Sequence, residues 1–139
     1  MSSGAVVDCS VAMTVVFRDE ATAATRKFFR TFANKPLLVP GIWHYEVANV
    51  LALSYRHGRI DRSQLLRSLK DLDTLQFEAD ETPPRELLAD IIDLCRHHSL
   101  TAYDAAYLAV AMRRQLPLAT LDKKLAIAAI DMGVELIPL

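Results

Sequence analysis

Short apolar runs, separated by longer segments of mixed character, are the most regular feature of this sequence. Residues 5–7 and 37–39 are apolar, and so are 116–121 apart from Thr120, which is typical of buried strands. Residues 77–79 and 134–137 are two further runs that we predict to be strands. The chain is therefore expected to contain four or five short strands.

The segments between these runs carry apolar residues every three or four positions, the spacing of one face of an α-helix. Ser10 is expected to cap the first helix and Asp61 a later one, while Pro84 begins another, because proline lacks the N–H that a first helical turn leaves free. Gly58 and Gly133 mark two helix ends. The predicted helices span 10–17, 22–32, 42–57, 61–72, 84–97, 101–114 and 122–132.

Strands and helices alternate along the whole chain. This order predicts right-handed crossovers and a largely parallel sheet with helices on both faces. We therefore expect an α/β fold, a three-layer α/β/α domain with a central sheet of about four or five strands, and residues 1–139 as a single domain. Ligands of such sheets bind beyond the carboxyl ends of the strands, so function is expected there.

Composition excludes several classes of protein. Hydrophobic residues make up 52% of the 139 residues and the mean hydropathy is +0.17, which excludes a disordered chain. Apolar runs such as 108–112 are far shorter than the roughly 20 residues that span a bilayer. Residues 1–4 lack the positive charge and the long apolar stretch of a secretory signal. We expect a soluble, cytoplasmic protein that does not contact a membrane.

Cysteine content and net charge narrow the chemistry further. Cys9 and Cys95 are too few for a disulfide framework, and neither has a neighbour at metal-ligand spacing. The 16 basic and 17 acidic side chains nearly cancel, so any contact with nucleic acid has to use local patches. Basic clusters at 56–67, 113–114 and 123–124 are candidates for phosphate contacts, with solvated surface as the alternative.

Four acidic residues lie where a predicted strand gives way to a helix, or within a nearby helix: Asp8, Glu46, Asp104 and Asp122. Three of them have a structural explanation when taken alone. Asp8 and Asp122 are good helix N-caps, and Asp104 follows Thr101 by three residues, as in a capping box. Glu46 differs, because it lies in mid-helix on an inward face, where an unpaired carboxylate is costly; a solvated or paired glutamate is the alternative.

Taken together, the four acids predict a metal site. A parallel sheet gathers residues that follow its strands at one edge, so all four can converge. Carboxylates held close together repel one another, and proteins usually offset this repulsion with a cation or with raised pKa values. Oxygen ligands without histidine or cysteine favour Mg²⁺ or Mn²⁺ over zinc. Such ions activate water and neutralise phosphoryl groups, which indicates a hydrolase acting on phosphodiesters.

Four segments also carry a family resemblance: 6–12, 43–51, 100–109 and 118–125. They resemble the motifs of PIN-domain ribonucleases and, more narrowly, of the VapC toxins of type II toxin–antitoxin pairs. The resemblance covers nearly the whole chain in the right order, and Thr-Ala-Tyr-Asp-Ala-Ala-Tyr-Leu-Ala at 101–109 is its most specific part. Cys9 departs from the family, where alanine or threonine is more usual, and the bulky aromatic residue common near Val15 or Val16 is missing.

The resemblance implies a PIN-like α/β domain that cleaves RNA internally with Mg²⁺ or Mn²⁺. It carries over the acidic site, with Asp8, Asp104 and Asp122 as metal ligands and Glu46 completing the site or orienting the attacking water. It also implies three supporting polar residues, Ser10, Asn49 and Thr120, of which Asn49 lies one turn after Glu46. The expected partners are an RNA substrate, a cognate antitoxin that blocks the acidic groove, and a second copy of the chain.

Two other functions fit the same residues. A Mg²⁺-dependent phosphatase would use Asp8 as a nucleophile, but the usual Asp-x-Asp element of such enzymes needs an acid at position 10, where this chain has Ser10. A non-catalytic module that binds RNA or protein would keep the fold and use its acids as helix caps. Metal-dependent RNA cleavage distinguishes the ribonuclease from both.

Overall fold

A four-stranded parallel sheet forms the centre of the protein, as described by a computed structural model that covers residues 4–139. Its strands are β1 (Ala5–Val7), β2 (Leu37–Val39), β3 (Phe77–Ala79) and β4 (Leu118–Ala119). Their order across the sheet is β3-β2-β1-β4, and every neighbouring pair is parallel. The prediction that residues 1–4 are not a secretory signal falls mostly on residues 1–3, which lie outside the described residues.

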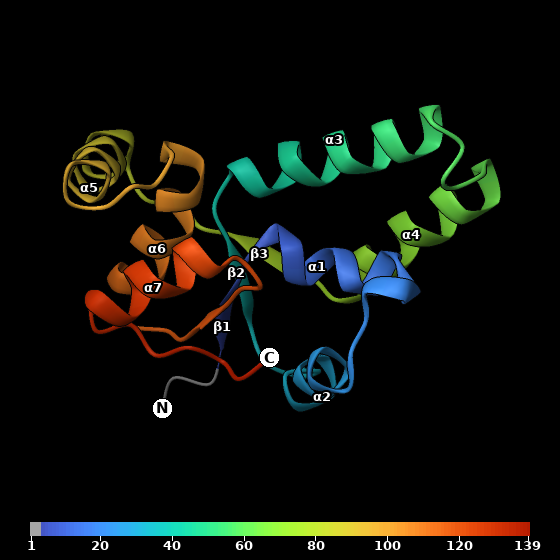
Figure 1. Cartoon of the computed structure of the whole chain (residues 1–139), viewed down its shortest axis with the longest axis horizontal. Helices are drawn as coiled ribbons and strands as arrows, with labels where there is room; N and C mark the ends of the chain where they lie inside the picture. Colours follow the sequence, from blue (N-terminus) through green and yellow to red (C-terminus); the bar gives the residue numbers. More distant parts are fainter. Residues whose placement is uncertain (1–3) are drawn as a thin grey trace.

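The connections between the strands are helical. The helices are α1 (Cys9–Val16), α2 (Ala23–Thr31), α3 (Ile42–Arg56), α4 (Arg62–Thr74), α5 (Pro84–His97), α6 (Ala102–Arg114) and α7 (Lys123–Asp131), with a short 3-10 turn, η1 (Arg18–Glu20). The chain moves outward from β1 through β2 to β3. It then returns through α5 and α6, which lie on the left in Figure 1, and places β4 on the other side of β1. The sheet therefore has its topological switch point between β1 and β4, where ligands of open α/β sheets bind.

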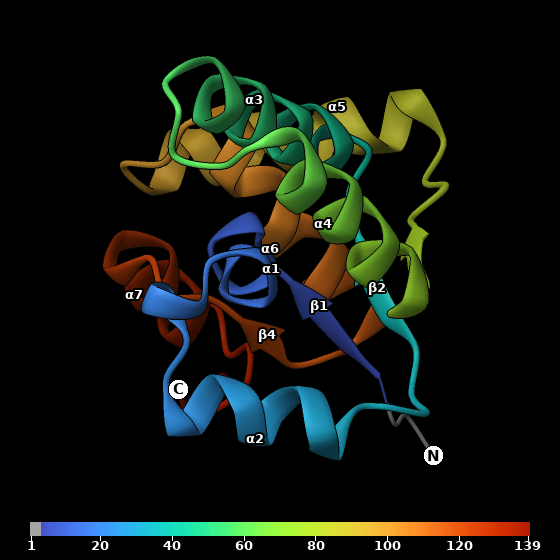
Figure 2. The ribbon, with the colours of Figure 1, turned by 90° about the vertical axis from the view of Figure 1, so that its right-hand side faces the viewer.

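Helices cover both faces of the sheet, which confirms the predicted three-layer α/β/α fold. Val6 of β1 faces a large cluster that includes Tyr107 and Leu108 of α6, while Val7 faces a smaller cluster that includes Phe28 of α2. The alternation follows from the strand period of two, which sends successive side chains to opposite faces. Figure 2 shows α2 beneath the strands and the α3 and α4 pair on the opposite side of the molecule. Within residues 4–139, no helix is both long and apolar enough to cross a bilayer.

Helix α6 is the central helix of the fold. It contacts β1, β2, β4, α5 and α7, and its residues 105–111 are all buried. A helix that is apolar on all sides is expected only where neighbours surround it, so these contacts explain the composition. Because α6 is fixed on every side, side chains that it directs toward the carboxyl ends of the strands are held rigidly.

Several predicted boundaries were correct and two elements were wrong. The strands at 5–7, 37–39 and 77–79 and the helix at 84–97 are confirmed residue by residue. Asp61 caps α4, as predicted, whereas Thr22 and Thr101 lie just outside their helices as N-caps rather than inside them. Residues 134–137 do not form a fifth strand, because only one bridge, Leu118 to Leu136, joins them to the sheet. The strand expected at 116–121 is limited to two residues.

Ser10 is a further error, because it does not cap α1. The helix begins one residue earlier, at Cys9, and Asp8 occupies the N-cap position with extended backbone angles. Ser10 therefore lies in the first turn, where its hydroxyl is free to reach side chains outside the helix.

Candidate active site

The switch point between β1 and β4 places Asp8 in a buried pocket of hydroxyl groups. Asp8 directly follows β1, is only 7% exposed, and its backbone N–H donates to the Ala119 carbonyl of β4 at 3.0 Å. Its side-chain atom Oδ2 accepts hydrogen bonds from Thr120 Oγ1 at 2.6 Å and from Ser10 Oγ at 2.9 Å. Both bonds end on the same oxygen, and no hydrogen bond reaches Oδ1 from any residue in 4–139.

The two hydroxyls are themselves held by the loop after β4. Thr120 Oγ1 accepts from the Asp122 N–H at 3.0 Å, and Ser10 Oγ accepts from the Leu121 N–H at 3.1 Å. Each hydroxyl oxygen thus accepts a hydrogen bond from a backbone N–H and donates its own O–H to Asp8, so the direction of both bonds is fixed. The predicted supporting positions Ser10 and Thr120 are brought to Asp8 by this network.

Glu46 reaches the same region from α3 and is paired with Tyr107, a residue of the 101–109 motif to which the sequence assigned no role. Tyr107 of α6, which is fully buried, donates its hydroxyl proton to Glu46 Oε1 at 2.5 Å. Burial raises the pKa of Glu46, the Tyr107 bond lowers it, and the negative charges of Asp8 and Asp104 raise it further. Burial and the neighbouring Glu46 raise the pKa of Tyr107, so its hydroxyl stays a donor.

Asp104 and Asp122 complete the group of acids. Burial raises the pKa of Asp104, and so do the charges of Asp122 and Asp8; the Thr101 hydroxyl and the Lys124 ammonium act in the opposite direction without cancelling the rise. These electrostatic effects link acids that lie far apart in the sequence. The carboxylates of Asp8, Glu46 and Asp104 form no ion pair with any basic residue in the described part of the chain.

The capping explanations hold for only part of this set. Asp122 does cap α7, since its Oδ1 accepts from the Leu125 N–H at 3.1 Å. The Asp8 side chain makes no capping bond to α1. At α6 the cap is Thr101, whose hydroxyl accepts from the Asp104 N–H at 3.2 Å. Capping therefore occupies Oδ1 of Asp122 and leaves its Oδ2 without a hydrogen bond in residues 4–139, and it leaves the carboxylates of Asp8 and Asp104 for another role.

The structure does not bring every predicted residue into contact with the acids. Asn49 is exposed on α3, and within residues 4–139 no hydrogen bond connects its side chain to the carboxylates. Its supporting role remains a prediction from its position one turn after Glu46. Cys9 is buried, and burial together with Glu46 and Asp8 raises the pKa of its thiol to about 12. Cys9 is therefore a neutral packing residue and not a thiolate ligand.

The donor chemistry of the site suits a hard divalent cation. Among residues 4–139, no three histidine, cysteine, aspartate or glutamate side chains are already grouped closely enough to hold a metal ion. Binding would therefore require the carboxylates to close on the ion. The carboxylate oxygens of Asp8, Asp104 and Asp122 are the ligand type that Mg²⁺ and Mn²⁺ prefer. Burial and, after it, the charges of Asp122 and Asp8 raise the pKa of Asp104, and a cation would offset both effects.

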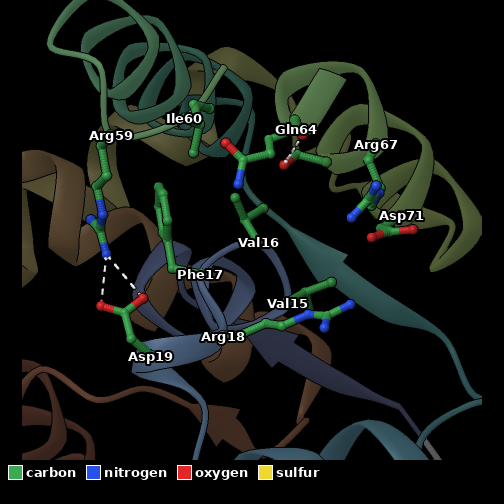
Figure 3. A pocket seen from close by; sticks show the side chains of 11 residues that line it. Val15, Val16, Phe17, Arg18, Asp19, Arg59, Ile60, Gln64, Arg67 and Asp71 are labelled. Carbon is green, nitrogen blue, oxygen red and sulfur yellow. Dashed lines mark hydrogen bonds and ion pairs between the residues drawn. The ribbon is translucent and has the colours of Figure 1, made fainter. Parts of the chain in front are cut away.

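A separate hollow of about 380 Å³ lies at the other end of α1, between η1 and α4 (Figure 3). Arg59 stacks on the Phe17 ring at 3.7 Å from its centroid and pairs with Asp19 at 3.3 Å and Glu20 at 2.8 Å. None of the four acids lines this hollow. Because the acids of the switch point lie elsewhere, we place the chemistry there and not in this hollow.

Three arginines of the predicted basic clusters are occupied by ion pairs within the chain. Arg59 is bound to Asp19 and Glu20, Arg113 pairs with Glu86 and Asp90 of α5, and Arg114 donates to Asp80 at 2.8 Å. The bonds of Arg113 and Arg114 attach α6 to its neighbours. The expectation that position 113–114 is a phosphate patch is therefore weakened, because its guanidinium groups already have carboxylate partners.

Comparison with known proteins identifies the family. The sequence model of the PIN domain matches residues 5–131. The chain belongs to the PIN-domain family. The match begins at β1 and ends with α7, so it includes every acid of the site in this PIN domain.

Relatives of this PIN domain agree with that result. Ribonuclease VapC3 of Pyrobaculum aerophilum is 35% identical over 82 residues, which are 59% of this chain and 63% of the relative, so the match spans less than two thirds of that protein. The crystal structure of PAE2754 from the same organism is 30% identical, with a TM-score of 0.66 over 92% of this chain and 87% of that one. A toxin–antitoxin complex from Klebsiella pneumoniae shares the fold at 19% identity, with a TM-score of 0.61 over 88% and 90% of the two chains.

Proposed function

We propose that this PIN domain is a Mg²⁺- or Mn²⁺-dependent endoribonuclease and the toxin of a type II toxin–antitoxin pair. The observation that carries the proposal is the buried Asp8, whose Oδ2 is fixed by two hydroxyls while Oδ1 receives no hydrogen bond within the described chain. An aspartate that only stabilised the fold would be expected to have both oxygens paired. The similarity to Ribonuclease VapC3 supports RNA as the substrate.

The roles of the individual residues follow from their positions. Asp8, Asp104 and Asp122 hold the cation, and Ser10 and Thr120 keep the Asp8 carboxylate in one orientation. A bound Mg²⁺ or Mn²⁺ would supply positive charge to the phosphodiester and lower the pKa of an attacking water. Glu46, whose carboxylate lies close enough to Asp8 and Asp104 to feel their charges, would orient that water for in-line attack.

Metal addition is expected to have two separable effects on the purified chain. Mg²⁺ or Mn²⁺ should start the cleavage of single-stranded RNA, and it should raise the free energy of unfolding by about 2.7 kcal/mol at a concentration 100 times its Kd. A chelator should reverse both effects. RNA cleavage is followed on gels and stability by thermal unfolding with and without metal. Cleavage of equal rate in the presence of the chelator contradicts a metal-dependent reaction, and absence of both effects favours a non-catalytic binding module.

An antitoxin and a second copy of the chain are the proposed protein partners. The Klebsiella pneumoniae structure, which shares the fold, is a toxin–antitoxin complex, and this supports an antitoxin whose binding blocks the acidic site. Inhibition of RNA cleavage by the protein encoded beside this chain is the measurement that tests it.

The exposed face of α3 supports the homodimer. Tyr45 is 75% exposed and Tyr55 45% exposed, and with Ala48 and Ala52 they form a stripe at helical spacing. On nearby α5, Leu88 and Ile92 are 60% and 57% exposed. An apolar surface of this kind is typical of contact between subunits. Light scattering of the chain alone should give twice the 15.5 kDa chain mass, and Tyr45→Glu should reduce it to one chain mass. A wild-type chain of single mass contradicts the homodimer.

A further inference from the structure

Tyr107 contacts the acidic site, and although it lies within the 101–109 motif, neither the family resemblance nor a helix cap assigns it a role. It lies on α6 one turn after Asp104, and its side chain has no exposed surface. Its hydroxyl donates to Glu46 Oε1 at 2.5 Å, across 61 positions of sequence. The bond therefore attaches Glu46 of α3 to α6, the helix that also carries Asp104.

A purely structural role does not account well for this pair. A buried tyrosine hydroxyl needs an acceptor, and a backbone carbonyl would serve without placing a charge in the interior. Here the acceptor is a carboxylate that two further acids already repel, Asp8 and Asp104. A charged acceptor in such surroundings is unfavourable for the fold on its own, since nothing basic pairs with Glu46 within residues 4–139.

The position of Tyr107 also makes it a rigid support. Helix α6 is packed against strands and helices on all sides, so the tyrosine ring cannot follow a movement of Glu46. Glu46 lies on α3, whose face near this residue is only partly buried. A glutamate side chain has three rotatable bonds, and without the hydroxyl its carboxylate would turn away from Asp8 and Asp104 toward solvent. The bond holds one oxygen, Oε1, and leaves Oε2 without a hydrogen bond in the described chain.

We infer that Tyr107 is a positioning residue, which holds the Glu46 carboxylate toward Asp8 and Asp104 in the geometry that the RNA-cleaving site requires. This inference rests on the proposed function of the site and adds a residue to it. Groups that orient the residues of a metal site are typically worth about 10–100-fold in activity or metal affinity. A side chain that acts only through Glu46 should have no effect once Glu46 is removed.

The test is a double-mutant cycle with two readouts. Tyr107→Phe, Glu46→Gln and the double variant are compared with the wild type in RNA cleavage kinetics, and in Mn²⁺ affinity measured from the electron paramagnetic resonance signal of free Mn²⁺. Tyr107→Phe keeps the buried ring, and it should lower kcat by about 10-fold with KM for RNA unchanged. The double variant should be no worse than Glu46→Gln alone, because both changes remove the same arrangement. Mn²⁺ affinity should follow the same pattern.

Tyr103→Phe is the matched control. It is the same substitution on the same helix, but Tyr103 is 60% exposed, so both kcat and Mn²⁺ affinity should stay at wild-type values. Thermal unfolding of all variants shows whether they are folded.

The outcomes separate the inference from the proposed function. A Tyr107→Phe chain that cleaves RNA and binds Mn²⁺ like the wild type, or losses that multiply in the double variant, overturns the inference and leaves the ribonuclease standing. Coupled losses of Mn²⁺ affinity in a chain that cleaves no RNA support the inference and overturn the ribonuclease. A wild type that neither binds Mn²⁺ nor cleaves RNA overturns both.

Discussion

Asp8→Asn should lower the kcat of RNA cleavage by at least about 100-fold and leave the fold intact. Both hydrogen bonds to the Asp8 side chain end on Oδ2, from Thr120 and Ser10. An asparagine amide oxygen at that position accepts both bonds, so the free energy of unfolding should change by less than about 1 kcal/mol. The amide NH₂ then takes the place of Oδ1, and it is neutral and a donor, so it cannot bind a cation. Single-turnover cleavage kinetics and urea unfolding measure the two quantities.

Asp73→Asn is the control for this substitution. Asp73 is an exposed aspartate of α4 whose side chain makes no hydrogen bond or ion pair within residues 4–139. It removes the same charge, so kcat should stay within about twofold of the wild type if the effect at Asp8 comes from the site. Undiminished cleavage in both Asp8→Asn and Asp104→Asn would show that the acidic site is not the active site. Trapping of phosphate on Asp8 would instead point to the phosphatase.

Leu108→Ala should strongly destabilise the fold, with a loss of about 2–5 kcal/mol in the free energy of unfolding. Leu108 lies on α6, has no exposed surface, and belongs to the larger of the two core clusters. Replacement by alanine leaves a cavity that a helix packed on every side cannot close. Native domains have a stability of about 5–15 kcal/mol, so the loss is a large part of the total. Urea unfolding monitored by circular dichroism measures it.

Leu66→Ala is the control for Leu108→Ala. It removes the same side-chain atoms at an exposed position, where no cavity is left. Leu66 is 54% exposed on α4, and the same substitution there should cost less than about 0.5 kcal/mol. Equal losses at the two positions would contradict the close packing of α6 against its neighbours. Because α6 carries both Asp104 and Tyr107, kcat of the Leu108→Ala chain should also fall as the temperature approaches its lowered midpoint.

The extent to which sequence predicted the fold depends on the length of each element. Helices of 13 to 15 residues, such as α3 and α6, repeat their apolar spacing often enough to be found within one or two positions. The segment 134–137 was predicted as a strand because it is apolar and follows a helix stop at Gly133. A segment becomes a strand only if a neighbouring strand forms several hydrogen-bonded pairs with it, and this segment is joined to β4 by a single bridge. Four residues carry too little periodicity to distinguish these outcomes.

In the site too, the sequence identified some residues correctly, while the contacts of others became clear only in the structure. The four acids were identified from their places after strands and in helices, and from the motifs around them. Ser10 was taken for a cap, since a serine before an apolar helix usually is one, but the helix begins at Cys9 and frees the hydroxyl for Asp8. Tyr107 was missed because a tyrosine on an apolar helix face usually belongs to the core. The signal that it carries, a buried hydroxyl in need of an acceptor, identifies a partner only once α3 is placed beside α6.

The sequence by itself determined the alternation of strands and helices, the α/β class, and the identity of the acids, because these depend on local spacing and residue type. Only the tertiary structure decided which oxygen of each acid is paired and which is left without a bond. Those pairings join residues such as Asp8 and Thr120, which are 112 positions apart, and Glu46 and Tyr107, which are 61 apart. The physical reason is that a hydrogen bond requires two atoms within about 3 Å, and the order of strands at the switch point brings them there.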